Sequence, residues 1–122
     1  MPSEPQKHLD VFPNPKPDRK YLIEFSCPEF TCVCPKTGQP DFATLHIKYV
    51  PNKKCVELKS LKLYLWSYRN EGTFHEKCTN KILDDIVAAV CPHYAEVIGD
   101  FFVRGGIHTI VTARHGVKPQ NV

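Results

Sequence analysis

The chain has 122 residues, 42% of them hydrophobic and 24% charged, with a formal net charge of +3 at pH 7. This length corresponds to one domain with a small core, and the scattered charges exclude the long basic stripe of a duplex-binding protein. No apolar signal segment opens the chain, and no stretch approaches the roughly 20 apolar residues of a membrane helix. We therefore expect a cytoplasmic protein that contacts neither membrane nor nucleic acid directly and whose six cysteines are thiols.

The first elements of the chain are predicted to be an arm and two strands. Residues 1–20 contain five prolines and no apolar periodicity, which predicts an extended arm or a disordered tail before a single folded domain over residues 21–122. Tyr21–Phe25 is predicted to be a short strand that ends in a proline-rich loop. Ala43–Val50 alternates between apolar and polar residues, as a half-buried strand does. Its apolar face consists of Leu45, Ile47 and Tyr49.

Two helices are predicted to follow. Cys55–Leu58 is predicted to be extended, and Ser60–Asn70 has an apolar stripe at helical spacing. Thr73 and Glu76 have the spacing of a capping box that opens a second helix, which Pro92 ends. The two stripes consist of Leu61, Tyr64, Leu65 and Tyr68, and of Ile82, Leu83, Ile86, Val87 and Val90.

The last predicted elements are the strands Tyr94–Val103 and Ile107–Thr112, joined at Gly105 and Gly106. The resulting order is strand, strand, helix, helix, strand, strand. The sequence therefore predicts an α+β fold in which two helices pack on one face of an antiparallel sheet.

The segment with the clearest chemical potential runs from Cys34 to Asp41 and is stiffened by prolines. A thiolate attacks electrophilic carbon, and a nearby carboxylic acid can return the proton. Lys36 is a local cation that could lower the Cys34 pKa. Two alternatives stay open: a buried structural thiol, and a zinc site that uses Cys27, Cys32 and Cys34. Their spacing does not repeat the usual paired-ligand pattern, so we expect no metal.

A second group of polar residues could bind ligands. Glu57 could pair with the N–H groups of a purine-like ring, and Lys59 and Lys62 could share a phosphate. Arg104 could face a phosphate beside a glycine backbone that a ligand can approach. The alternatives are a solvated lysine face, a surface His75 and a simple hairpin turn. No G-x-G-x-x-G pattern is present, so a Rossmann-type dinucleotide site is not predicted.

Four blocks of the sequence resemble one family as a set, in order and in spacing. They are FTCVCPKTGQPDFA, VELKSLKLY, FHEKCTN and RGGI, and the similarity as a whole runs over about residues 21–107. The chain resembles the short, single-domain form of the NADPH-dependent 7-cyano-7-deazaguanine reductases of queuosine tRNA modification, the QueF family. This resemblance implies a tunnelling fold whose subunits assemble into a barrel, predicted here to be a decamer of two pentamer rings with ligands between subunits.

The resemblance also implies a role for each matched residue. Cys34 corresponds to the nucleophile that forms a covalent thioimide with the nitrile, and Asp41 to the general acid–base residue. Glu76 and His75 correspond to substrate-binding residues, and the second substrate-contacting segment consists of Val56, Glu57 and Leu58. The residues placed for the NADPH phosphates are Lys59, Lys62 and Arg104. Two molecules of NADPH are expected per nitrile reduced.

Other functions stay open beside this one. A cyclohydrolase of the GTP cyclohydrolase type could share the fold, and a non-catalytic module could bind a purine-like ligand. Cys78, one helical turn after His75 in the sequence, could form a disulfide that protects Cys34, although a half-buried helix cysteine is an equal alternative.

Overall fold

A four-stranded antiparallel sheet is the frame of the molecule, which the computed structural model describes over residues 3–122. The strands are β2 (Ile23–Val33), β3 (Pro40–Val50), β5 (Tyr94–Arg104) and β6 (Ile107–Gly116). They lie side by side in the order β2-β3-β5-β6, so each hairpin forms one half of the sheet. Between β3 and β5 the chain leaves the sheet and forms the helices.

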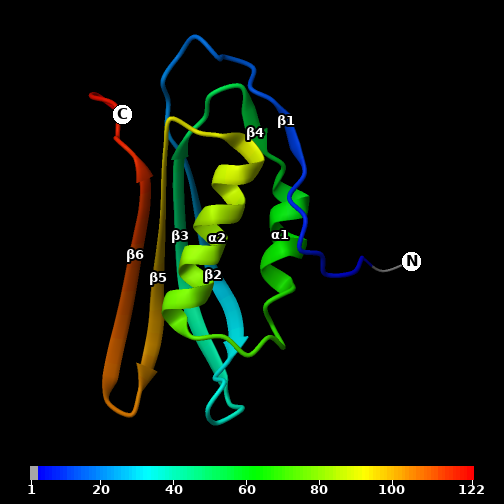
Figure 1. The fold of residues 1–122 in the computed structure, drawn as a ribbon, viewed down its shortest axis with the longest axis vertical. Coiled ribbons are helices and arrows are strands. Elements are labelled where there is room, and N and C mark those ends of the chain that lie inside the picture. The colour runs from blue at the N-terminus through cyan, green and yellow to red at the C-terminus, as the bar shows by residue number, and fades with distance from the viewer. Residues whose placement is uncertain (1–2) are drawn as a thin grey trace.

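Both helices lie on the same face of this sheet (Figure 1). α1 (Leu58–Trp66) lies near β2, and α2 (His75–Val90) packs against β5 and β6. The predicted fold class and the ββααββ order are therefore confirmed. No helix within residues 3–122 combines the length and the apolarity needed to cross a membrane.

The core includes the apolar stripes that the sequence predicted on β3 and on the two helices. Each of these side chains is at most 5% exposed, and burying one stabilises the fold by about 1.5–3 kcal/mol. They are Leu45, Ile47, Tyr49, Leu61, Tyr64, Tyr68, Ile82, Leu83, Ile86 and Val90. Leu65 and Val87 pack against this core and are partly buried.

The first strand of the sheet is longer than predicted. Tyr21–Phe25 was predicted to end in a loop because Pro28 follows, but β2 continues to Val33. The pairing with β3 shifts register between Cys27 and Phe30, so Pro28 lies in a bulge. Proline is tolerated there because a bulged edge strand does not need its N–H in the ladder.

The first helix begins two residues earlier and ends four residues earlier than the predicted Ser60–Asn70. It begins at Leu58 because the Glu57 carboxylate accepts hydrogen bonds from two N–H groups of the first turn, so Leu58 is not part of an extended segment. Beyond Trp66 the backbone makes i+3 hydrogen bonds, which still carry Tyr68 into the core.

The proline-rich arm packs on its own chain over the described residues 3–20. β1 (Val11–Pro13) pairs antiparallel with β4 (Lys54–Val56), and Leu9 is buried in the core. Within the arm, Val11–Pro13 is extended and the N–H of Arg19 donates to the carbonyl of Lys16 in a turn. Met1 and Pro2 lie outside the described residues.

The capping box predicted for α2 is wrong. The N-cap residue is Phe74, which makes no side-chain capping bond. The N–H of Thr73 donates to the carbonyl of Val33, 3.0 Å away, and its hydroxyl donates to the Phe74 carbonyl. The backbone of Thr73 is thus bonded to β2, and the helix begins after it, at His75. The Glu76 side chain is not part of a cap.

The β5–β6 hairpin turns at the two predicted glycines. Gly105 and Gly106 have φ values of +57° and +80°, which residues other than glycine rarely adopt. The hairpin is longer than predicted, since β6 continues past Thr112 to Gly116. Its turn places Arg104 beside the loop that follows β2.

Candidate active site

The residues expected to carry chemistry meet where the β2–β3 loop approaches the start of α2. A cavity of about 380 Å³ opens there. Five of the predicted site residues line it: Cys34, Asp41, His75, Glu76 and Arg104. They come from the β2–β3 hairpin, the first turn of α2 and the end of β5.

The nucleophile candidate lies on a closed loop. The N–H of Cys34 donates to the carbonyl of Gln39 at 2.8 Å, and the N–H of Gly38 donates to the carbonyl of Cys34 at 2.8 Å. Gly38 has a φ of +74°, so the turn requires a residue without a side chain. These bonds hold the partly exposed Cys34 thiol at the cavity.

The loop itself makes this thiol more acidic. The hydroxyl of Thr37, followed by the N–H groups of Thr37 and Lys36, lowers the pKa of Cys34 below its ordinary value. Desolvation and the negative charge of Asp41 act in the opposite direction but are smaller. Lys36 thus contributes through its backbone, whereas the sequence suggested its ammonium group. A lowered pKa increases the fraction of reactive thiolate near neutral pH.

Replacing Thr37 with valine is expected to raise the pKa of Cys34. Because the hydroxyl stabilises the thiolate, alkylation of Cys34 by iodoacetamide should begin at lower pH in the wild type than in the variant. The midpoint should lie below the ordinary thiol pKa of about 8.5 in the wild type and move upward in Thr37→Val. Mass spectrometry of the Cys34 peptide across a pH series measures this, and Thr37→Ser is the control that keeps the hydroxyl. An unchanged midpoint in Thr37→Val would contradict the assignment.

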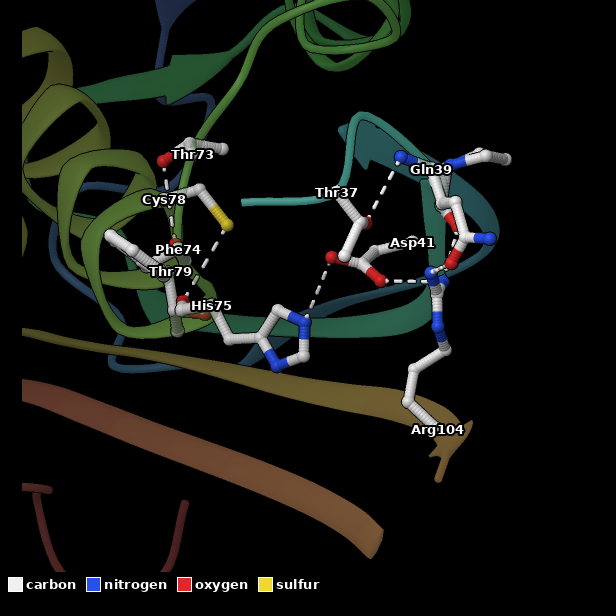
Figure 2. A network of polar contacts seen from close by, with 10 residues as sticks. Thr37, Gln39, Asp41, Thr73, Phe74, His75, Cys78, Thr79 and Arg104 are labelled. Atoms are coloured by element: carbon white, nitrogen blue, oxygen red, sulfur yellow. Dashed lines mark hydrogen bonds and ion pairs between the residues drawn. The ribbon is translucent and has the colours of Figure 1, made fainter. Parts of the chain in front are cut away.

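Asp41 lies between the side chains of His75 and Arg104. Its side chain is 7% exposed, with Oδ2 3.2 Å from Nε2 of His75 and Oδ1 2.9 Å from Nη1 of Arg104 (Figure 2). A nearly buried carboxylate needs such partners, because burial without them costs several kcal/mol. The arrangement places a proton-carrying His–Asp pair next to the thiol loop.

His75 is held by residues that the sequence did not single out. Its ring stacks on Phe101, with ring centroids 3.8 Å apart and an interplanar angle of 6°. Its carbonyl accepts a hydrogen bond of 2.8 Å from the hydroxyl of Thr79. Phe101 and Thr79 are fully buried, so they form a rigid support for the ring.

Gly99 makes room for this support. A Cβ at this position would lie 2.7 Å from both the Phe101 ring and the Thr79 hydroxyl, whereas one at Gly72 would lie 3.9 Å from its nearest neighbour. We therefore expect Gly99→Ala to lower the free energy of unfolding by about 1–3 kcal/mol through overpacking. Urea denaturation measures this. Gly72→Ala is the control and should change the free energy far less, and equal effects would contradict the argument.

Of the two acids predicted to bind substrate, only one lines this cavity. Glu76 is exposed and contributes to the cavity wall. The carboxylate of Glu57 instead accepts hydrogen bonds of 2.7 and 2.8 Å from the N–H groups of Lys59 and Ser60, which lower its pKa. Within this chain, Glu57 therefore serves as the N-cap of α1.

Two of the remaining predicted residues line a second cavity. It measures about 840 Å³ and opens between β2 and α1, where Leu58 and Lys62 line it. Lys59 is exposed on the same helix, and Val56 is buried in β4. The β2–β3 loop contributes to both cavities, since Gly38 lines the larger cavity and Gln39 the smaller one.

The six cysteines are all free thiols. Cys78 is buried, and its thiol donates to the His75 carbonyl at 3.5 Å. The protective disulfide with Cys34 stays a prediction. Within residues 3–122, no group of three or more His, Cys, Asp or Glu side chains is arranged to hold a metal ion.

Comparison with solved structures supports the fold. The apo crystal structure of the archaeosine synthase QueF-Like aligns with a TM-score of 0.70 at 24% sequence identity. The alignment covers 82% of this chain and 96% of that one. At this identity the likeness concerns the fold alone.

Comparison with sequences identifies the family. The sequence model described as "QueF-like protein" matches residues 40–120. A protein of Anaeromyxobacter sp. (strain Fw109-5), named NADPH-dependent 7-cyano-7-deazaguanine reductase, is 68% identical over the whole of both chains. Proteins with that name from Thermomicrobium roseum and Alkalilimnicola ehrlichii are 64% and 59% identical over 94% of this chain, covering 90% and 89% of their own lengths. The chain therefore belongs to the QueF-like family, as its sequence motifs predicted.

Proposed function

We propose that this chain reduces the nitrile of 7-cyano-7-deazaguanine to an aminomethyl group, with NADPH as the reductant, in queuosine tRNA modification. The names of its full-length relatives support the reaction. The observation that carries the proposal is the cavity in which the acidified thiol of Cys34 and the His75–Asp41 pair meet. A nucleophile and a proton donor at one cavity are what addition to a nitrile requires.

In the first step, the Cys34 thiolate adds to the nitrile carbon. One bond of the C≡N triple bond breaks, a C–S bond forms, and the nitrogen takes the proton that the Cys34 thiol has given up to the Asp41 carboxylate, which gives a covalent thioimide. Asp41 can recover a proton through His75, because Nε2 of His75 lies 3.2 Å from its Oδ2. The thioimide carbon accepts a hydride more readily than the nitrile does.

NADPH supplies a hydride at each of two reductions, because a nitrile needs four electrons to become an amine. Between the two, Cys34 leaves as a thiolate and an imine remains. We propose that Lys59 and Lys62 hold the cofactor phosphates. In support, Lys62 lines the larger cavity together with Arg69 and Trp66, and cationic and aromatic side chains suit an anionic dinucleotide. Arg104, the third predicted cation, lies in the smaller cavity.

The substrate ring is proposed to lie against Glu76 and His75. Glu76 lines the cavity, and its carboxylate could accept hydrogen bonds from the ring N–H groups. The segment Val56, Glu57 and Leu58 does not line this cavity, so we propose that it reaches a substrate across a subunit boundary.

We propose a homo-oligomer of two pentamer rings in the cytoplasm. In support, β2 and β6 are the edge strands of the sheet, and an unpaired edge is a template for pairing with another chain. Large apolar side chains are exposed near the β5–β6 turn: Phe102, Val103, Ile107 and Ile110. Six free thiols agree with a reducing compartment. Light scattering after gel filtration measures the subunit number.

The activity is tested by mixing the protein with 7-cyano-7-deazaguanine and NADPH and following the loss of NADPH absorbance. We expect two NADPH oxidised per substrate consumed. Omitting NADPH should trap the thioimide, visible as a mass increment on the Cys34 peptide. Binding of the nitrile without NADPH consumption would instead indicate a non-catalytic module, and a GTP cyclohydrolase would consume GTP.

A further inference from the structure

The guanidinium of Arg104 binds three acceptors on the segment that joins the nucleophile to the general acid. Nη1 donates to the carbonyl of Pro40 at 2.6 Å and to Oδ1 of Asp41 at 2.9 Å, and Nη2 donates to Oε1 of Gln39 at 2.6 Å (Figure 2). Arg104 itself is the last residue of β5, where a two-glycine turn follows. One side chain from the second hairpin thus contacts three consecutive residues of the first hairpin.

These three acceptors determine the geometry of the site. The backbone carbonyl of Gln39 accepts the N–H of Cys34 at 2.8 Å, so fixing Gln39 also fixes the residue that carries the thiol. Asp41 has its other carboxylate oxygen against His75. A guanidinium is planar and presents its donors in a rigid fork, whereas an ammonium group is a point charge on a flexible stem. Only arginine can therefore span these three acceptors at once.

We propose that Arg104 is a positioning residue and not a ligand of the NADPH phosphates. It holds the Cys34 loop and the Asp41 carboxylate in the relative positions that addition to the nitrile requires. This inference rests on the proposed function. A phosphate at Arg104 would compete with Asp41 for the guanidinium, and Asp41 is nearly buried and needs its partners. The role differs from the one that the sequence resemblance implies.

The covalent step separates the two roles, because the thioimide forms without NADPH. The rate of the mass increment on Cys34 is measured after mixing protein with 7-cyano-7-deazaguanine alone, for the wild type, Arg104→Ala and Arg104→Lys. We expect Arg104→Ala to slow this step about 100-fold, as a misplacement of about 1 Å does. Arg104→Lys keeps the charge but not the fork and should be about tenfold slower. The control Arg19→Ala removes an exposed arginine from the arm and should react at the wild-type rate.

The outcomes distinguish a positioning role of Arg104 from cofactor binding and from a failure of the proposed function. If both Arg104 variants form the thioimide at the wild-type rate and only the KM for NADPH rises, Arg104 binds cofactor and the proposal is overturned. If Arg104→Ala fails to fold, as judged by thermal unfolding, Arg104→Lys alone decides: slow addition with an unchanged KM for NADPH supports the positioning role, and wild-type addition refutes it. If the wild type forms no thioimide, the proposed function fails and not this inference.

Discussion

Replacing Cys34 with alanine is expected to abolish both NADPH consumption and the covalent adduct. The thiol is the nucleophile candidate that lines the cavity, and its pKa is lowered by the loop around it. Without the C–S bond the nitrile stays a poor hydride acceptor, so turnover should fall by about 10⁶-fold, the order observed when a covalent nucleophile is removed. Steady-state NADPH oxidation and intact mass after exposure to the nitrile measure the two effects.

The loss should be chemical and not structural. Cys34 is partly exposed, so alanine should change the free energy of unfolding by no more than about 0.5 kcal/mol. Cys91 is an exposed thiol outside both cavities, and Cys91→Ala is the matched control that should keep full turnover. Turnover in Cys34→Ala at a rate near that of the wild type would refute the covalent mechanism.

The sequence predicted best the elements in which apolar residues recur at a regular spacing. The alternation from Leu45 to Tyr49 and the stripe from Ile82 to Val90 both coincide with buried faces. The boundaries were predicted less well because they depend on local exceptions. Pro28 was interpreted as a strand breaker, but it lies in a bulge of an edge strand, where the ladder does not need its N–H.

The wrong capping box has a consequence for the site. A capping box would turn the Glu76 carboxylate back onto the N-terminus of α2, away from any ligand. The structure instead starts this helix without a side-chain cap, and Glu76 lines the cavity. The acid that does cap a helix is Glu57, which the sequence assigned to the ligand. The roles of two similar carboxylates are thus set by backbone geometry that the sequence pattern does not show.

The sequence could relate site residues that are close along the chain, but it could not predict the contacts between distant ones. Cys34 and Asp41 are seven positions apart in one hairpin, so their chemistry could be inferred together. The bond between Arg104 and Asp41 joins residues 63 positions apart, and the stack of His75 on Phe101 exists only once α2 packs against β5. A threonine such as Thr37 carries no sequence signal beyond its position in the loop, yet it makes the largest contribution to the lowered pKa of Cys34.

Replacing Asp41 with asparagine is expected to lower kcat by about 10² to 10⁴-fold, the usual contribution of general acid–base catalysis. Asparagine keeps the shape of the side chain, but its amide cannot deliver a proton to the nitrile nitrogen. It also removes the negative charge that holds His75 and Arg104, which lie 3.2 and 2.9 Å away. Thioimide formation without NADPH and steady-state turnover measure the loss.

A matched control exists on the same sheet. Asp100 pairs with His108 as Asp41 pairs with His75, but Asp100 is 40% exposed and lines neither cavity. Asp100→Asn removes the same charge from the same kind of pair and should leave kcat unchanged. If Asp41→Asn kept the wild-type kcat, the proton would have to come from another group, and His75 could not supply it through Asp41. Addition of the thiolate to the nitrile carbon and reduction of the imine both end with a proton on nitrogen, so loss of the relay should slow every stage of turnover that forms an N–H bond.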